Sequence, residues 1–445
     1  MTLTRHLRET VALAAPVMVG RMSILALVVE DTLMTGRHGV QDLAWYGLAA
    51  SPQVPLFLLG LGLLMGTVVL TAQAYGAGRT EECGAVLRSG LVHALAAGVV
   101  LALVCQVGEP LLLALGQTPV LAAGAGRVLG VLGLGIPGAL LFATCTFFLE
   151  GIGRPLPATV IMLGANVLNI GLNWVLVYGN LGAPAMGAEG AAAATTIVRW
   201  CTFAAVGAYI ALRVDATRFG LRRAPGAPPS GLGARLRRIG LPTSLAHGLE
   251  SGAFAAMTII AGWLGTRHVA AYQVAVNLLS TGFMIAVGCG TAASVRVGHA
   301  VGRGEARGAR VAGWVALGLG LGTMALVALG FALLPRELAG LYVDDPVVLA
   351  LTAATLVVAS MALVADGAHG VLIGALRGMA DVWPATLVYM VSFWAVMVPL
   401  GYWLSVRADM GAPGLMGGVL GGALVAALAL AVRFDRVARR IAPTT

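Results

Sequence analysis

Three acidic side chains lie within, or at the edge of, long apolar runs, where a carboxylate needs a partner. Asp366 stands in the segment VADGAH, Glu250 lies in a second run, and Asp31 follows Glu30 near the end of the first run. An unpaired charge at the centre of a bilayer costs at least about 2.5–3.5 kcal/mol. These acids therefore indicate sites that bind a cation and release it as the protein changes shape.

Two of the acids each share a helix face with a histidine. His247 precedes Glu250 by three residues, and His369 follows Asp366 by three. The two predicted helices run in opposite directions, so both acids reach the centre of the bilayer, where such a pair can take up a proton or hold Na⁺. The pairs resemble the Glu-x-x-His ligands of di-iron bundles, but the additional bridging carboxylates are missing from this half of the chain. For the histidines we expect hydrogen bonding, proton relay or packing rather than a metal site.

Polar amides are candidates to support the acids. Asn169 and Asn173 are four residues apart on one predicted helix and could donate hydrogen bonds to Asp31. If the first helix stops just before Asp31, that acid would only meet water at the headgroups. Gln273 and Asn277 are also four apart and could line a cavity. Amide pairs of this kind also serve simply as contacts between helices.

The composition is that of a polytopic membrane protein. Of 445 residues, 59% are hydrophobic and 11% are charged, and apolar runs of roughly 20 residues or more recur along the chain. Lipid requires internally satisfied backbones, and the runs exceed the roughly ten residues of a barrel strand. The sequence predicts an all-α membrane protein with about twelve transmembrane helices. The expected spans are 11–33, 46–73, 88–107, 119–148, 156–178, 186–211, 239–264, 269–299, 310–334, 346–374, 382–405 and 412–434.

The basic residues indicate membrane orientation rather than nucleic-acid binding. The formal net charge is +9, the chain contains no lysine, and the arginines concentrate in alternate connections between the spans. The positive-inside rule then places both termini in the cytoplasm of a multi-pass protein of the bacterial inner membrane. The five cysteines stand singly, which indicates neither a disulfide framework nor a thiolate metal site.

The two halves of the chain have similar sequences. Pro16 and Tyr46 recur with equal spacing as Pro242 and Tyr272. Six spans in each half, with the same starting orientation, indicate parallel repeats. The predicted organisation is two pseudo-symmetric six-helix lobes, an N-terminal lobe at 1–212 and a C-terminal lobe at 239–434, with a cytoplasmic linker at 213–238 and a cytoplasmic tail at 435–445.

Taken together, these segments resemble the multidrug and toxic compound extrusion (MATE) family, in its NorM-like branch. The resemblance covers nearly the whole chain and implies two six-helix bundles in a V shape, with Asp31, Glu250 and Asp366 as the essential acids. Two positions depart from the family pattern, since Arg21 replaces a polar uncharged residue and Ala362 replaces an aromatic one. The segments that carry the resemblance are EDTLMTG from Glu30, NIGLNWVLVYGNLGAP from Asn169, AAYQVAVNLLSTGFMIAVGCGTAASVRVGHAVG from Ala270 and DGAHGVLIGALRG from Asp366.

The resemblance implies a secondary antiporter, not an enzyme. It would export amphipathic, often cationic compounds in exchange for Na⁺ or H⁺, with no cofactor besides that coupling ion. We expect a monomer whose partners are small organic cations and the lipid bilayer, not nucleic acid. Two alternatives stay open. One is a lipid-linked saccharide flippase of the same superfamily, which should show further spans or a strongly cationic cavity; the other is a membrane metalloenzyme built on the His–acid pairs.

Overall fold

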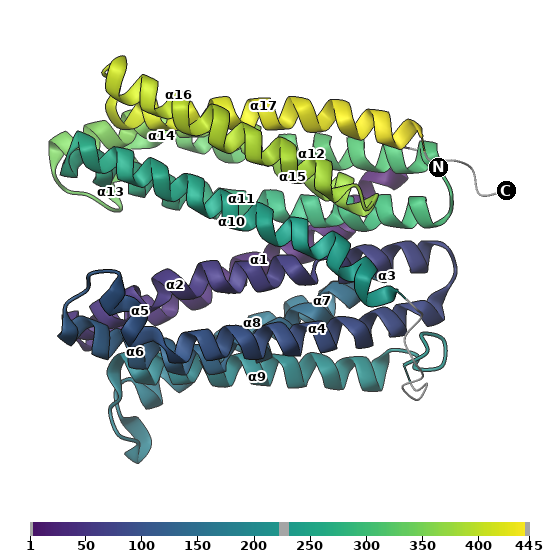
Figure 1. Ribbon diagram of the computed structural model, residues 1–445, viewed down its shortest axis with the longest axis horizontal. Coiled ribbons are helices and arrows are strands. Elements are labelled where there is room, and N and C mark those ends of the chain that lie inside the picture. The colour runs from purple at the N-terminus through teal and green to yellow at the C-terminus, as the bar shows by residue number, and fades with distance from the viewer. Residues whose placement is uncertain (1–2, 222–230, 441–445) are drawn as a thin grey trace. The chain divides into compact units, whose positions relative to one another are not determined.

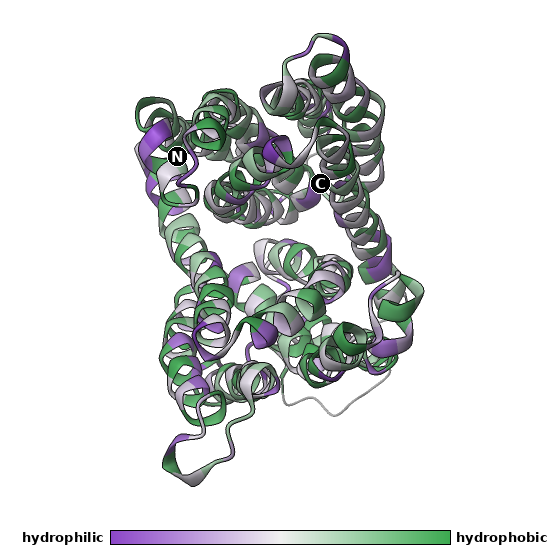
Figure 2. Ribbon diagram, turned by 90° about the vertical axis from the view of Figure 1, so that its left-hand side faces the viewer, coloured by the Kyte–Doolittle hydropathy of each residue, from purple (hydrophilic) through white to green (hydrophobic). Residues whose placement is uncertain are grey.

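The computed structural model describes residues 3–221 and 231–440, and all regular secondary structure in these ranges is helical (Figure 1). Eleven helical segments of the described chain are long and apolar enough to cross a membrane. The all-α membrane fold is thus confirmed, and hydrophobic residues are spread over the helices of both units (Figure 2). The helix Leu232–Leu264 is not among the eleven, although 239–264 was an expected span; its 33 residues include Glu250, His247 and three arginines.

The chain forms two compact units, and two long helices are divided between them. Helix α1 (Leu3–His38) belongs to one unit up to Arg21 and to the other from Met22, and helix α10 (Leu232–Leu264) changes unit after Ser244. Part of the expected linker 213–238 is therefore helical, since α10 begins at Leu232. The expected tail 435–445 is also partly helical, since α17 (Gly411–Arg439) runs on to Arg439. Residues 222–230 and residues 441–445 lie outside the described ranges.

The first unit comprises Met22–Tyr75 and Arg79–Ser244. Its span α2–α3 is interrupted at Met65 and its span α6–α7 at Gly135, where Pro137 enters the first turn of the next helix and cannot donate a backbone hydrogen bond. Its complete helices are α2 (Val40–Leu64), α3 (Gly66–Gly76), α4 (Thr80–Gln106), α5 (Gly108–Ala114), α6 (Pro119–Leu134), α7 (Ile136–Gly151), α8 (Leu156–Leu176), η1 (Asn180–Gly182) and α9 (Gly187–Arg213).

The second unit comprises the start of α1, Gly76–Gly78 and the chain from Leu245. Its complete helices are α11 (Thr266–Gly302), α12 (Ala306–Leu333), α13 (Pro335–Gly340), α14 (Pro346–Gly378), α15 (Val382–Met390), η2 (Val391–Met397), α16 (Val398–Tyr402), η3 (Trp403–Arg407) and α17 (Gly411–Arg439). The stretch η2 is π-helical and directly precedes α16, where Pro399 lacks the amide that would continue an α-helical ladder.

Small residues let α11 and α14 approach closely in the second unit. A Cβ atom on Gly374 would collide with the carbonyl oxygen of Gly290, and one on Gly378 would meet the carbonyl of Ser294. Without a hydrophobic driving force in lipid, such close backbone packing is a main source of helix association. It also fixes the rotation of α14, the helix on which Asp366 lies.

A buried arginine ties the start of α1 to the same unit. The Arg296 guanidinium on α11 donates to the His6 carbonyl oxygen at 2.6 Å, to Thr10 Oγ1 at 2.6 Å and to Glu9 Oε2 at 2.9 Å. Arg296 is only 7% exposed. The positive charge is thereby neutralised, and α1 begins firmly packed on α11.

Candidate functional site

Asp31 lies inside α1, which continues to His38, so the expectation that this acid only meets headgroup water does not hold. Asp31 is only 1% exposed. One carboxylate oxygen accepts hydrogen bonds from Nδ2 of Asn169 and of Asn173, at 2.8 and 2.7 Å. The other accepts from the Tyr46 hydroxyl at 2.7 Å and from Thr195 Oγ1 at 2.5 Å. Four donors from three further helices thus converge on one acid.

This arrangement suits an ionised carboxylate, because hydrogen bonds to a charged acceptor are the strong ones. Among the ion pairs of the described residues, none joins Asp31 to an arginine; Arg199 on α9 lies near enough to interact with Asp31 electrostatically but donates its hydrogen bond to the Leu132 carbonyl at 3.2 Å. The amide oxygens of Asn169 and Asn173 are buried without a hydrogen-bond partner. The site therefore brings the Asp31 carboxyl group together with two further oxygen atoms that no donor occupies.

Sequence reasoning found three members of this cluster and missed two. Tyr46 had been noted only because it recurs in the second half as Tyr272, and Thr195 is a single hydroxyl in an alanine-rich run. The recurrence of Tyr46 was a usable signal, since a buried phenol in a transmembrane helix needs a hydrogen-bond partner. Thr195 offered no comparable signal, because threonine hydroxyls commonly bond to their own helix backbone.

A second cluster lies in the other unit, around Glu250 on α10 and Asp366 on α14. Asp366 is 5% exposed, and its Oδ1 lies 3.2 Å from Nδ1 of His369, which is also buried. Tyr389 on α15 hydrogen-bonds with Glu250, and both acids lie near enough to interact electrostatically. His247 Nδ1 is 3.6 Å from Glu250 Oε2, which is too long for a hydrogen bond. The structure therefore brings the two His–acid pairs together.

Aromatic rings enclose the histidine of this second cluster. The His369 ring centroid lies 4.8 Å from that of Tyr389, 5.8 Å from that of Phe393 and 6.2 Å from that of Phe283. Tyr389 and Phe393 are stacked at 4.2 Å. Ala362, where the family resemblance leads one to expect an aromatic residue, is fully buried in the core of this unit. The rings near the acids come from α11, α15 and η2 instead.

The remaining predicted polar residues lie apart from the acids. Gln273 Nε2 is 3.4 Å from Thr258 Oγ1, and Asn277 Oδ1 accepts from the Tyr342 hydroxyl at 3.0 Å. Both amide residues are exposed in the isolated chain. Within the described ranges, no group of three or more His, Cys, Asp or Glu side chains is placed to hold a metal ion.

Buried acids with exchangeable partners in a multi-pass helical fold define the class of protein: a membrane transporter. The match to the MatE family model covers residues 16–175 and 242–403, and its second part begins at Pro242, the residue that the internal repeat pairs with Pro16. The chain belongs to the MATE family of transporters.

Individual relatives agree with this assignment. The chain is 36% identical to "Probable multidrug resistance protein NorM" of Caulobacter vibrioides, over 96% of this chain and 90% of that protein. It is 33% identical to "Multidrug resistance protein NorM" of Aliivibrio fischeri, over 96% of this chain and 94% of that protein. A solved multidrug resistance MATE family transporter of the MOP superfamily, in an outward-facing conformation, shares the fold with a TM-score of 0.91 and 21% identity, over 98% of this chain and 96% of that one.

Proposed function

We propose that this protein is a secondary antiporter that exports amphipathic, cationic drugs or toxic compounds in exchange for Na⁺ or H⁺. The observation that carries the proposal is Asp31, a buried acid that is held by four neutral donors and by no arginine. A carboxylate locked to an arginine would have its charge permanently cancelled. One held by neutral donors can exchange them for a cation, as ion coupling requires.

The two clusters support different ways of binding the coupling ion. Around Asp31, carboxylate, amide and hydroxyl oxygens lie together, which are the hard ligands that Na⁺ prefers. Around Glu250 and Asp366, two acids, two histidines and Tyr389 form a set of titratable groups that suits proton transfer, and the paired acids could also hold Na⁺. In either case the ion drives transport only through different affinities for the two conformations.

Purified protein in liposomes with an imposed gradient tests the proposal. A pH gradient or a Na⁺ gradient should move a cationic dye, and varying Na⁺ at fixed pH identifies the ion. Asp31→Asn and Asp366→Asn should abolish the gradient-driven movement, whereas Glu337→Gln, on the short exposed helix α13, should leave it unchanged. The proposal is wrong if neither gradient moves the dye and Asp366→Asn behaves like the parent protein.

We further propose that the protein acts as a monomer in the bacterial inner membrane with both termini in the cytoplasm. The start of α1 and the end of α17 lie at the same end of their unit (Figure 1). The connection between α11 and α12 lies there too, since Arg296 contacts His6 and Arg310 contacts Asp435. Terminal fusions to a reporter that is active only in the cytoplasm test the orientation: both fusions should be active, and inactive fusions at both termini would reverse it.

A further inference from the structure

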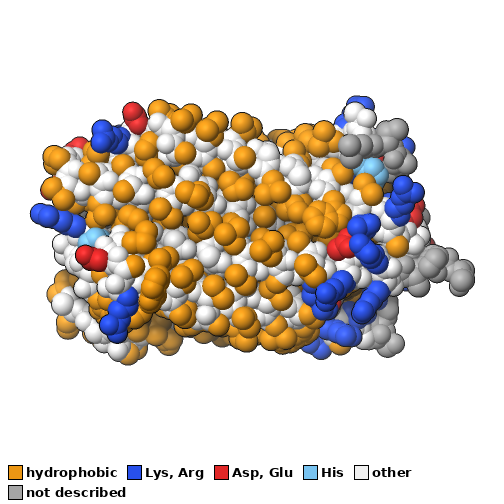
Figure 3. Space-filling model, turned by 90° about the horizontal axis from the view of Figure 1, so that it is seen from above, with side chains coloured by type: hydrophobic (Ala, Val, Ile, Leu, Met, Phe, Trp, Pro, Cys, Tyr) orange, Lys and Arg blue, Asp and Glu red, His pale blue; other side chains and the backbone are white. Residues whose placement is uncertain are grey.

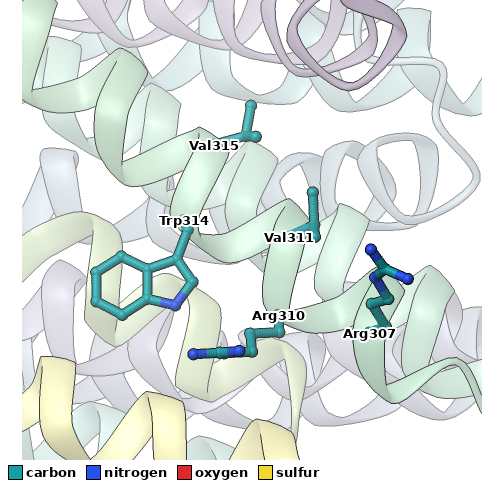
Figure 4. Close-up of a pocket in the computed structure, with 5 residues that line it drawn as sticks. All are labelled: Arg307, Arg310, Val311, Trp314 and Val315. Carbon is teal, nitrogen blue, oxygen red and sulfur yellow. The ribbon is translucent and has the colours of Figure 1, made fainter. Parts of the chain in front are cut away.

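An exposed groove runs along one face of α12, outside both acid clusters. Two arginines lie at its start, an indole lies one turn further along, and two valines complete the wall (Figure 4). Their spacing along the helix places all of them on one side. The lining residues are Arg307, Arg310, Val311, Trp314 and Val315.

The groove carries an excess of positive charge. Arg310 pairs with Asp435 on α17 at 2.6 Å, and Asp435 also pairs with Arg439 at 2.6 Å, so one acid serves two arginines. Arg307 is exposed and forms no ion pair with any described residue. Arginine side chains gather at this end of the face seen in Figure 3, whereas its middle is covered by apolar side chains. An anion is the complementary ligand.

The position of the groove along α12 corresponds to the membrane surface. The helix has 28 residues, whereas a hydrocarbon core of about 30 Å needs about 20 residues at 1.5 Å each. If the span is centred on the core, Arg307 lies at headgroup level, Arg310 lies at the edge of the hydrocarbon core, and Trp314 lies about 6 Å below Arg310. The groove therefore passes from the headgroup region into the outer part of the hydrocarbon core.

Contacts within the protein hold the Trp314 indole in place. Trp314 packs edge-on against Phe434 of α17, with ring centroids 6.0 Å apart. The neighbouring Gly313 permits this contact, because a Cβ atom there would collide with the Phe434 ring. The aromatic wall of the groove is therefore preformed, while its basic wall keeps one guanidinium free for a ligand.

We propose that this groove binds an anionic phospholipid of the cytoplasmic leaflet. Its phosphate would lie at the level of Arg307 and Arg310, the glycerol region beside Val311, and the start of an acyl chain along Trp314 and Val315. A bidentate match between guanidinium and phosphate favours arginine in this role. A soluble anion would leave the apolar part of the groove unused.

Native mass spectrometry of the purified protein with added lipid tests this inference. The probes are phosphatidylglycerol, which carries a net negative charge, and phosphatidylcholine, which does not. The test variant is Arg307→Gln with Arg310→Gln, in which Asp435 keeps Arg439 as its partner. The matched control is Arg336→Gln, which removes an exposed arginine at α13, the opposite end of α12.

Phosphatidylglycerol should bind in preference to phosphatidylcholine. That preference should fall about five-fold for each arginine removed, and about 25-fold in the double variant, with no change in Arg336→Gln. Millimolar inorganic phosphate should not displace the lipid; displacement would show a site for free anions instead. Equal binding of both lipids, or an unchanged preference in the double variant, would also overturn the inference. If the double variant unfolds, Arg307→Gln alone decides the matter, because it breaks no ion pair.

Discussion

Replacing Asp31 by alanine removes the common acceptor of four buried donors, and the structure indicates how much this costs. The hydroxyls of Tyr46 and Thr195 can rotate to other acceptors, because their hydrogen atoms are not fixed by the ring or the backbone. The amide groups of Asn169 and Asn173 have no such freedom, and their oxygens already lack partners. The Asn173 amide is therefore left buried without an acceptor, and the Asn169 amide keeps only a weak 3.5 Å contact with Glu30 Oε2.

Each stranded donor costs about 1–3 kcal/mol, so Asp31→Ala should lower the free energy of unfolding by about 2–6 kcal/mol. Asp31→Asn keeps one carbonyl acceptor for the two amides, and its own NH₂ group can donate to the two hydroxyl oxygens. The loss is then mainly that of the charge, about 1–2 kcal/mol. Asp31→Ala should therefore be the less stable of the two variants, yet both should abolish coupled transport.

Reversible unfolding in mixed detergent micelles measures the stability, and dye transport in liposomes measures the coupling. Thr32→Ala is the control, since its exposed hydroxyl bonds only to the backbone of its own helix, at Val28. Equal stability of Asp31→Ala and Asp31→Asn would refute the reasoning about stranded amides. Full transport by the stable Asp31→Asn variant would refute the role of the charge.

Three further predictions concern the other unit. Tyr389→Phe removes the hydrogen bond to Glu250, so the ion concentration for half-maximal transport should rise up to about ten-fold; an unchanged value would exclude Tyr389 from the ion site. Gly374→Ala overpacks the contact of α14 with α11 and should cost about 1–3 kcal/mol in unfolding experiments, whereas Gly318→Ala meets open space and should cost nothing. The pKa of Asp345 is lowered because its carboxylate accepts hydrogen bonds from two backbone amides at the start of α14. The ionised carboxylate therefore stabilises the folded protein at pH values above the ordinary aspartate pKa. This contribution is lost as the pH falls through the lower pKa of the folded state. Asp345→Asn keeps the cap and should remove that part of the acid sensitivity, as seen in unfolding temperatures at neutral and acid pH.

The sequence by itself determined that the chain folds in a lipid bilayer and which acids lie within its apolar segments. Long apolar runs allow only helices in lipid, so the all-α membrane fold followed from composition. Acids inside such runs are costly, and this marked Asp31, Glu250 and Asp366 without any knowledge of contacts. The spacing of His369 from Asp366 also predicted their proximity, because three residues along a helix return to the same face.

The tertiary structure alone decided which side chains surround each acid. Tyr46 and Thr195 reach Asp31 from α2 and α9, and Tyr389 reaches Glu250 from α15. Which faces of separate helices meet depends on their rotation and crossing, and these are set by close backbone contacts such as that of Gly374 with Gly290. Periodicity along one helix contains no information about that rotation. The sequence could therefore identify the buried acids but not the hydrogen-bond donors that surround them.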